Sequence, residues 1–314
     1  MMNKNNSNMK KISKNNEIIK KELRNKVILI TGGAGSVGSA LVKEVLRYPV
    51  KAVRVLDSNE HALFTLKRSL NDSRLRLLLG NILDKDRVEM AAVDADIIIH
   101  AAAAKNIEIT EFNAIDTIDI NINGTVNLIK SAIKTKPKKF LNISTDKVAE
   151  TSTLYGTTKE IGERLTTWAS QHFQSTKFAS IRFGNVIETR GNVFEVWEKE
   201  VSENKPISIT DPYMKRYFFH IDEAINFILE CLVNIHQGAI FIPKMKAYKI
   251  KDLADKVSKK QKIIGLRPGE KIEEILITDE ELRNAINKKK YWILKPKTIT
   301  KQHQIHQQNH LNHF

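Results

Sequence analysis

The stretch Val27–Ser39, which reads VILITGGAGSVGS, decides the fold. Its first four residues predict a buried strand, and apolar residues at helical spacing follow the turn: Leu41, Val42, Val45 and Leu46. In such a strand–turn–helix unit, glycines let the backbone turn tightly and approach a diphosphate closely. The stretch therefore predicts a dinucleotide site formed by Thr31, Gly32, Gly35, Ser36, Val37 and Gly38. An ordinary glycine-rich turn is the alternative.

An acidic residue at the end of the next strand is the second part of this pattern. Asp57 closes the segment Ala52–Leu56, about where a carboxylate would accept hydrogen bonds from the adenosine ribose. Because its charge would repel a 2'-phosphate, we expect NAD as the cofactor, with NADP as the alternative. A simple helix N-cap is the competing role for Asp57.

The alternation of strands and helices continues along the chain. Four more apolar runs read as buried strands separated by helix-length segments: Leu75–Leu79, Ile97–His100, Phe140–Ile143 and Phe178–Phe183. Continuous apolar runs are typical of parallel strands covered on both faces, so we predict an α/β protein with a Rossmann-type doubly wound parallel sheet. Small residues after two of these strands suit a ligand at the carboxyl edge, although helix packing could also require them.

Proton-transfer groups gather within sixteen residues, at Ser144–Lys147, Tyr155 and Lys159. Tyr155 and Lys159 are four residues apart in a segment with helical periodicity, so their side chains share one face. A phenol with a pKa of about 10 is a poor base at neutral pH, and a neighbouring ammonium would lower that pKa. Taken alone, a Tyr-x-x-x-Lys pair on a helix, or an Asp-Lys pair after a strand, is more often a solvated surface pair.

These motifs and several downstream ones together resemble a known family. From about Lys26 to about Thr278 the chain is similar to the UDP-N-acetylglucosamine 4,6-dehydratases, and most to those that invert carbon 5. These enzymes are extended short-chain dehydrogenases/reductases of surface polysaccharide biosynthesis. The resemblance also rests on His100–Ala103 with Lys105, Tyr155-Gly156-x-x-Lys159, Arg182–Val186, Arg190-Gly191, Ile209–Asp211 with Met214 and Arg216, Phe241–Lys244, and Arg267–Lys271.

The resemblance implies a smaller C-terminal substrate-binding lobe and a redox-neutral loss of water from a UDP-sugar. Tyr155, supported by Thr145 and Lys159, would take the proton of the carbon 4 hydroxyl as hydride passes to the nicotinamide. The ketone acidifies carbon 5. Lys147 would then remove the carbon 5 proton, Asp146 would protonate the departing carbon 6 hydroxyl, and hydride would return to carbon 6.

Binding roles also follow from the resemblance. For the cofactor, the resemblance implies contacts with the glycine loop and Asp57, and with Tyr155 and Lys159 at the nicotinamide end. It adds four further positions: Asn81, Ile82, Ala101 and Ala103. For the nucleotide sugar it implies contacts with Lys105, Asn185, Arg190, Thr210, Arg216, Arg267 and Glu270. The guanidinium groups of Arg216 and Arg267 suit the pyrophosphate. Members of the family commonly form dimers or larger oligomers, so a homo-oligomer is expected, and no metal site is implied.

Four positions depart from the family pattern. Asn81 replaces an aspartate, Thr151 and Glu195 replace prolines, and Glu188 replaces a glycine. These changes bear on loop geometry and on stereochemistry at carbon 5, where inversion is expected, more than on the proton-transfer groups.

Two other functions stay open. A nucleotide-sugar 4-epimerase on the same scaffold would need neither Asp146 nor Lys147. A non-catalytic dinucleotide-binding regulator would have no use for Thr145, Tyr155 or Lys159.

Charge is concentrated at the ends of the chain. The 314 residues carry a formal net charge of +15, and residues 1–26 and 286–314 each contribute +6. The nearly neutral body argues against a nucleic-acid partner. We expect a disordered basic head at 1–25, an NAD(P)-binding domain at 26–184, a substrate-binding lobe at 185–285 interleaved with the core, and a basic tail at 286–314.

The chain is expected in the cytoplasm, without membrane insertion. The head lacks the apolar core of a signal peptide, and no segment is long and apolar enough to span a membrane. Cys231 lies on an apolar helical segment and is expected in the core; as the one cysteine it excludes an internal disulfide. The tail histidines could bind metal, but a low-complexity end is favoured: His303, His306, His310 and His313.

Overall fold

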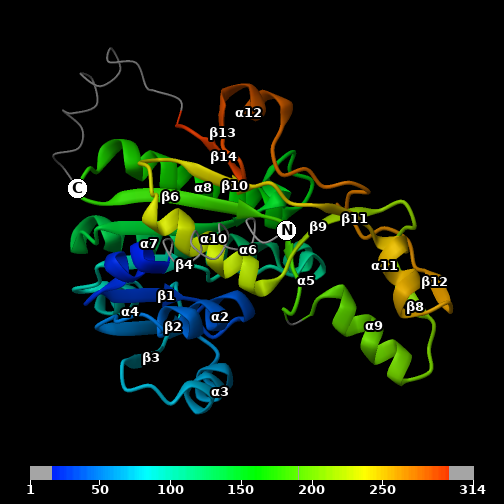
Figure 1. Cartoon of the computed structure of the whole chain (residues 1–314), viewed down its shortest axis with the longest axis horizontal. Helices are drawn as coiled ribbons and strands as arrows, with labels where there is room; N and C mark the ends of the chain where they lie inside the picture. Colours follow the sequence, from blue (N-terminus) through cyan, green and yellow to red (C-terminus); the bar gives the residue numbers. More distant parts are fainter. Residues whose placement is uncertain (1–15, 190, 297–314) are drawn as a thin grey trace, which may run out of the picture.

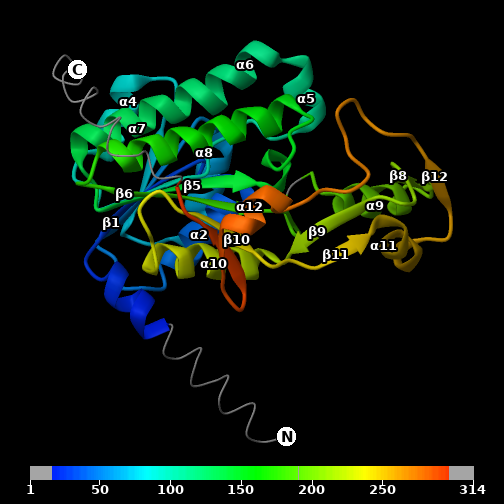
Figure 2. The same ribbon diagram turned by 90° about the horizontal axis from the view of Figure 1, so that it is seen from above.

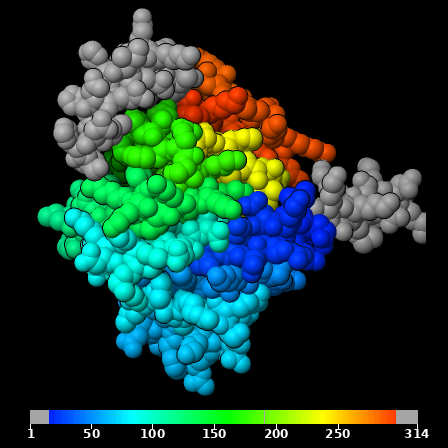
Figure 3. All heavy atoms as spheres, turned by 90° about the vertical axis from the view of Figure 1, so that its left-hand side faces the viewer, coloured from blue at the N-terminus to red at the C-terminus, as the bar shows by residue number. Residues whose placement is uncertain are grey.

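A nine-stranded sheet forms the centre of the molecule (Figure 1). The computed structural model describes residues 16–189 and 191–296. The strand order is β13-β14-β10-β6-β5-β4-β1-β2-β3; the strands from β3 to β10 are parallel, and β14 pairs antiparallel with both β10 and β13. Seen from the end opposite to the lobe, blue and cyan segments lie at one side of the body and yellow to red segments at the other (Figure 3). The order from β3 to β6 is that of a dinucleotide-binding sheet, so the predicted fold class is confirmed.

The strands of this sheet follow the apolar runs of the sequence. Their bounds are β1 Val27–Thr31, β2 Ala52–Asp57, β3 Leu75–Leu79, β4 Ile97–His100, β5 Lys139–Thr145, β6 Lys177–Phe183, β10 Ile240–Pro243, β13 Ala285–Asn287 and β14 Tyr291–Leu294. In β1, Ile28 and Ile30 pack on one face of the sheet and Leu29 on the other. Burial on both faces is why the run is continuously apolar.

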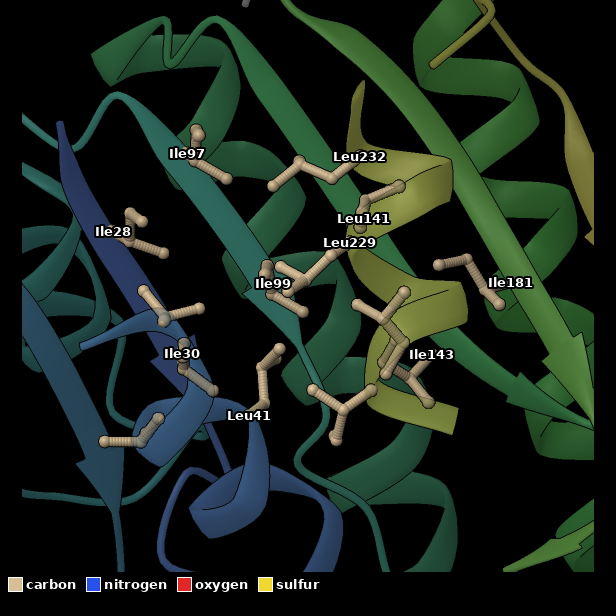
Figure 4. Packing of buried hydrophobic residues seen from close by; sticks show 14 of the residues in the cluster. Ile28, Ile30, Leu41, Ile97, Ile99, Leu141, Ile143, Ile181, Leu229 and Leu232 are labelled. Carbon is tan, nitrogen blue, oxygen red and sulfur yellow. The ribbon is translucent and has the colours of Figure 1, made fainter. Parts of the chain in front are cut away.

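Helices cover both faces of the sheet (Figure 2). One face carries α2 (Ser36–Val45), α3 (Glu60–Leu70) and α10 (Ile221–Val233), and the other carries α4 (Lys85–Ala92), α7 (Gly124–Thr135) and α8 (Leu154–His172). Figure 4 shows Leu41 of α2 and Leu229 of α10 packed against Ile99 of the sheet. Each such fully buried side chain contributes about 1.5–3 kcal/mol. Cys231 is buried on α10, as expected. In the described part of the chain, no helix has the length and apolar character needed to cross a bilayer.

A smaller lobe stands beside the carboxyl edge of the sheet (Figure 1). It contains the pair β8–β12, the strands β7, β9 and β11, and the helices α9 and α11; the bounds are β7 Asn185–Val186, α9 Val193–Ser202, β8 Ile207–Ile209, β9 Lys215–Phe219, β11 Ala247–Lys249, α11 Ile250–Val257 and β12 Gln261–Ile263. Trp197 fills the lobe's own core beside Ile207 and Met214, and its indole donates to the Ser208 carbonyl at 2.7 Å. The chain leaves the lobe for α10 and β10 and again for α12 (Asp279–Asn284) and the last two strands.

The two ends of the chain differ from the expectation. Disorder over 1–25 is wrong for 16–25, because 16–23 form a helix whose Ile19 and Leu23 are buried in the core. These two apolar residues are four apart, which aligns them on one helical face that packs against the core, whereas the remaining residues of the helix are polar except for the exposed Ile18. The expected tail is wrong at its start, since Ile286 and Tyr291–Leu294 belong to the sheet. Residues 1–15 and the four tail histidines lie outside the described residues.

Replacing Leu23 by alanine is expected to lower the free energy of unfolding by about 2–5 kcal/mol, because its buried side chain would leave a cavity. Ile18→Ala on the same helix is the matched control; Ile18 is 44% exposed, so this change should cost less than about 0.5 kcal/mol. Denaturant titration of both variants measures the two values. Equal losses would contradict the docking of this helix.

Candidate active site

A cleft of about 880 Å³ lies between the carboxyl edge of the sheet and the lobe. The cofactor, catalytic and substrate residues expected from the sequence all line it, except Arg190, which lies outside the described residues. Thr31, Asp57 and Thr145 are each the last residue of a parallel strand, which explains why residues far apart in sequence meet here. Their individual roles stay predictions.

The glycine-rich turn is so tight that a side chain at either of two positions would overlap neighbouring backbone. Gly32 has φ +66°, and a Cβ there would lie 2.6 Å from the Ala102 backbone. A Cβ on Gly38 would lie 2.2 Å from the Gly32 carbonyl oxygen. Helix α2 starts after Gly35 without a side-chain cap or an acidic residue in its first turn. This cradle fits a diphosphate at the positive end of a helix.

The Asp57 carboxylate is held by two backbone amides. Its Oδ2 accepts from the Ala34 amide at 3.0 Å and its Oδ1 from the Asn59 amide at 3.0 Å. The N-cap of α3 is Asn59, whose Oδ1 accepts from the Ala62 amide at 2.9 Å. The competing N-cap role for Asp57 is therefore excluded, and its carboxylate faces the cleft.

The proton-transfer groups come from two adjacent elements. Strand β5 ends at Thr145 and continues into a short turn of helix, Asp146–Val148, while Tyr155 and Lys159 lie in the first turns of α8. The Thr145 hydroxyl donates to Asp146 Oδ1 at 3.0 Å, and Lys147 Nζ donates to the same oxygen at 3.0 Å. The other oxygen of Asp146 is buried and has no hydrogen-bond partner among the described residues.

The charge that acts on Tyr155 differs from the expectation. Burial raises the pKa of the Tyr155 phenol, while the Lys147 ammonium and a hydrogen bond with Thr145 act to lower it. Burial also lowers the pKa of Lys159 to about 8, against the opposing charge of Glu163. The Lys147 ammonium is therefore a cation acting on the phenol that spacing along the helix did not indicate.

His100 is a buried polar residue whose role sequence reasoning missed. Its Nδ1 lies 2.8 Å from the Thr31 hydroxyl oxygen and its Nε2 lies 3.0 Å from that of Thr125. Burial, with the nearby charge of Lys159, lowers the pKa of His100 to about 3. The imidazole is therefore neutral at physiological pH and serves to join β1, β4 and α7 under the cleft.

Asn121 is a second residue that the sequence did not reveal. It lies in a π-helical turn, Asp119–Asn123, and such turns are frequent at functional sites. Its amide accepts from the Ala104 N–H at 2.8 Å and donates to the Ala104 carbonyl at 2.9 Å and to the Thr158 hydroxyl at 3.0 Å. Asn121 thus ties the loop after β4 to α8. The signal that marks Asn121 is the π-helical turn of the structure, which the spacing of apolar residues in the sequence does not indicate.

The Arg-Pro-Gly-Glu-Lys segment packs against the loop that precedes α8. The Ser152 hydroxyl donates to the Gly269 carbonyl at 2.7 Å. Arg216 donates to the carbonyls of Lys215, Ile272 and Lys271 at 2.8–3.1 Å. Most of the hydrogen-bond donors of Arg216 thus bind backbone carbonyls at and next to this segment. This structural role was not part of the expectation, which gave Arg216 only a contact with the pyrophosphate.

Comparison with known proteins agrees with this geometry. The model of the polysaccharide biosynthesis protein family matches residues 28–296. A UDP-N-acetylglucosamine 4,6-dehydratase (inverting) of Campylobacter jejuni is 35% identical over 86% of this chain and 83% of its own length. An uncharacterized membrane protein of Methanocaldococcus jannaschii is 38% identical, covering 83% of each chain. A UDP-glucose 4-epimerase of Rickettsia bellii is 31% identical over 83% of this chain and 80% of its own. The X-ray structure of Pen from Bacillus thuringiensis superposes with a TM-score of 0.83 at 34% identity, covering 87% of this chain and 90% of that one.

Gly38→Ala is expected to weaken NAD binding more than about tenfold and to destabilise the fold, because the new methyl group would overlap the backbone of Gly32 and Gly33. Gly162→Ala, also within a helix, is the matched control: its Cβ would meet nothing closer than 3.5 Å, so stability should stay equal or rise by about 0.5–1 kcal/mol.

Calorimetric titration with NAD and with NADP measures the binding. NADP should bind the unaltered chain more weakly, because the Asp57 carboxylate repels a 2'-phosphate. Equal NAD affinity in both glycine variants would argue that the cradle does not hold the dinucleotide.

Proposed function

This chain belongs to the polysaccharide biosynthesis protein family, and we propose that it is a UDP-N-acetylglucosamine 4,6-dehydratase that uses NAD and inverts carbon 5. The observation that carries the proposal is the buried Asp146–Lys147 pair, 3.0 Å apart, beside Thr145 and Tyr155 in the cleft. An acid and a base in contact at that position are what dehydration needs in addition to oxidation of carbon 4.

The residues divide the reaction between them. When bound along the glycine cradle, NAD supplies the acceptor and donor of hydride. Tyr155 takes the proton of the carbon 4 hydroxyl, and the Lys147 charge and the Thr145 hydrogen bond offset part of the rise in its pKa that burial causes. The carbon 4 ketone makes the carbon 5 proton acidic.

The Asp146–Lys147 pair then performs the elimination. One proton passed from Lys147 to Asp146 across their 3.0 Å contact leaves an amine and a carboxylic acid, without changing the net charge of the pair. The amine takes the carbon 5 proton and the acid protonates the departing carbon 6 hydroxyl. Inversion requires that carbon 5 regain a proton on the opposite face, for which Tyr155 or a bound water is the candidate donor.

A 4-epimerase is the second candidate, because epimerases are among the relatives. Epimerisation needs Tyr155 and Lys159 but not the Asp146–Lys147 pair. The test is incubation of the purified chain with UDP-N-acetylglucosamine. A product lighter by one water supports the dehydratase, an isomer of unchanged mass supports the epimerase, and no product supports neither enzyme. In deuterated water, NMR of the product gives the configuration at carbon 5; retention would reject the inverting assignment alone.

Lys147→Ala is expected to slow water release by at least about 100-fold, because it removes the base that acts after oxidation. Oxidation at carbon 4 should continue and be visible as accumulating reduced cofactor. Lys85→Ala, at an exposed position on α4, is the control and should leave both steps unchanged. Unaltered water release in the Lys147 variant would show that another group is the base.

A further inference from the structure

A third charged group lies beside the Asp146–Lys147 pair. We propose that Glu274 is a positioning residue for Lys147, a second carboxylate that acts on the elimination through the lysine and not by touching the sugar. The inference deepens the proposed dehydratase function and rests on it. It was not foreseen from the sequence, where Glu274 is one of two successive glutamates after the Arg-Pro-Gly-Glu-Lys motif.

The lysine is enclosed by two carboxylates. Lys147 Nζ lies 3.0 Å from Asp146 Oδ1 and 3.7 Å from Glu274 Oε1. The exposed fractions of the three side chains are 12% for Lys147, 0% for Asp146 and 4% for Glu274. Asp146 and Lys147 line the cleft, whereas Glu274 is not among the described residues that do. Glu274 therefore meets the lysine from the protein side.

The backbone on both sides of Glu274 is fixed. Two residues before it, the Ile272 carbonyl accepts from the Lys215 amide at 2.9 Å and from the Arg216 guanidinium at 3.1 Å. Two residues after it, the Leu276 carbonyl accepts from Arg182 at 3.1 Å. A buried charge costs several kcal/mol unless it is paired. The segment that carries Glu274 is anchored on both sides, and it places the buried carboxylate against Lys147. Because the burial of this charge is costly, the contact with Lys147 is a specific feature of the site.

The charges around Lys147 have opposite effects on its basicity. Burial acts to lower the lysine pKa and Arg216 of β9 does the same, while Asp146 and Glu274 raise it; the net direction is upward. Tyr155 of α8 also senses the lysine charge. During elimination the carbon 5–hydrogen bond breaks and a nitrogen–hydrogen bond forms at Nζ, and the electron pair passes toward the ketone. Glu274, 3.7 Å from Nζ, stabilises the ammonium that this step creates.

The test is the pH dependence of water release from UDP-N-acetylglucosamine by the full chain. The rate should fall at high pH, where Lys147 loses to solvent the proton that it would otherwise pass to Asp146. Removing a neighbouring negative charge lowers the pKa of Lys147, so the midpoint of this fall should move to lower pH. We expect Glu274→Gln to shift it down by about one pH unit or more, and to reduce the plateau rate about tenfold. Glu273→Gln is the matched control, because that neighbouring carboxylate is 56% exposed and pairs with Lys215 instead.

Glu274→Asp keeps the charge at a longer distance and should give an intermediate midpoint, which keeps the inference testable if the glutamine variant does not fold. If the Glu274 variants had the same pH midpoint of water release as Glu273→Gln, the inference would be overturned. The dehydratase function would still stand, because the wild-type chain would release water. A wild-type chain that releases no water from the substrate would overturn both. Loss of rate without any movement of the midpoint would assign Glu274 to folding alone and reject the proposed role.

Discussion

The buried guanidinium of Arg182 joins α8, the helix that carries Tyr155 and Lys159, to α12. It donates to Glu163 of α8 at 2.8 and 3.1 Å and to Glu281 of α12 at 2.9 Å through each of two nitrogens. Burial alone would favour its neutral form, yet the two carboxylates raise the pKa of Arg182. Because an unpaired charge in this position would be very costly, neither helix can move away without breaking the pair. The helix that carries Tyr155 is thereby locked to the segment that follows the lobe.

Other side chains at the cleft are likewise held by buried neighbours. The strands end in residues whose side chains are fixed by buried neighbours, such as Thr31 against His100 and Asp57 against two amides. Side chains held in this way lose little conformational freedom when a ligand arrives, which is the basis of preorganised binding. Lys147, held by carboxylates on two sides, follows the same rule.

The sequence predicted the features that depend on residues close together along the chain. Runs of apolar residues located the strands because burial on two faces leaves no room for polar side chains, and the glycines at 32 and 38 marked a backbone approach that a methyl group would block. Pairings across long separations were not accessible. Arg182 contacts Glu281, which lies 99 residues further along the chain, and Lys147 contacts Glu274, which follows the lobe strands in sequence. The pKa of Tyr155 depends on burial, which spacing along a helix does not report.

The path of the chain between body and lobe limits how this enzyme type can diversify. The lobe strands β8 and β9 precede α10 and β10, while β11 and β12 follow them, so the lobe is assembled from separate stretches of one polypeptide. Recombination therefore could not exchange the lobe as one continuous segment. A break after residue 184 would also separate α10 from α2, against which it packs in the core. New sugar preferences would have to arise by local substitution in the cleft, on a scaffold whose parts are inherited together.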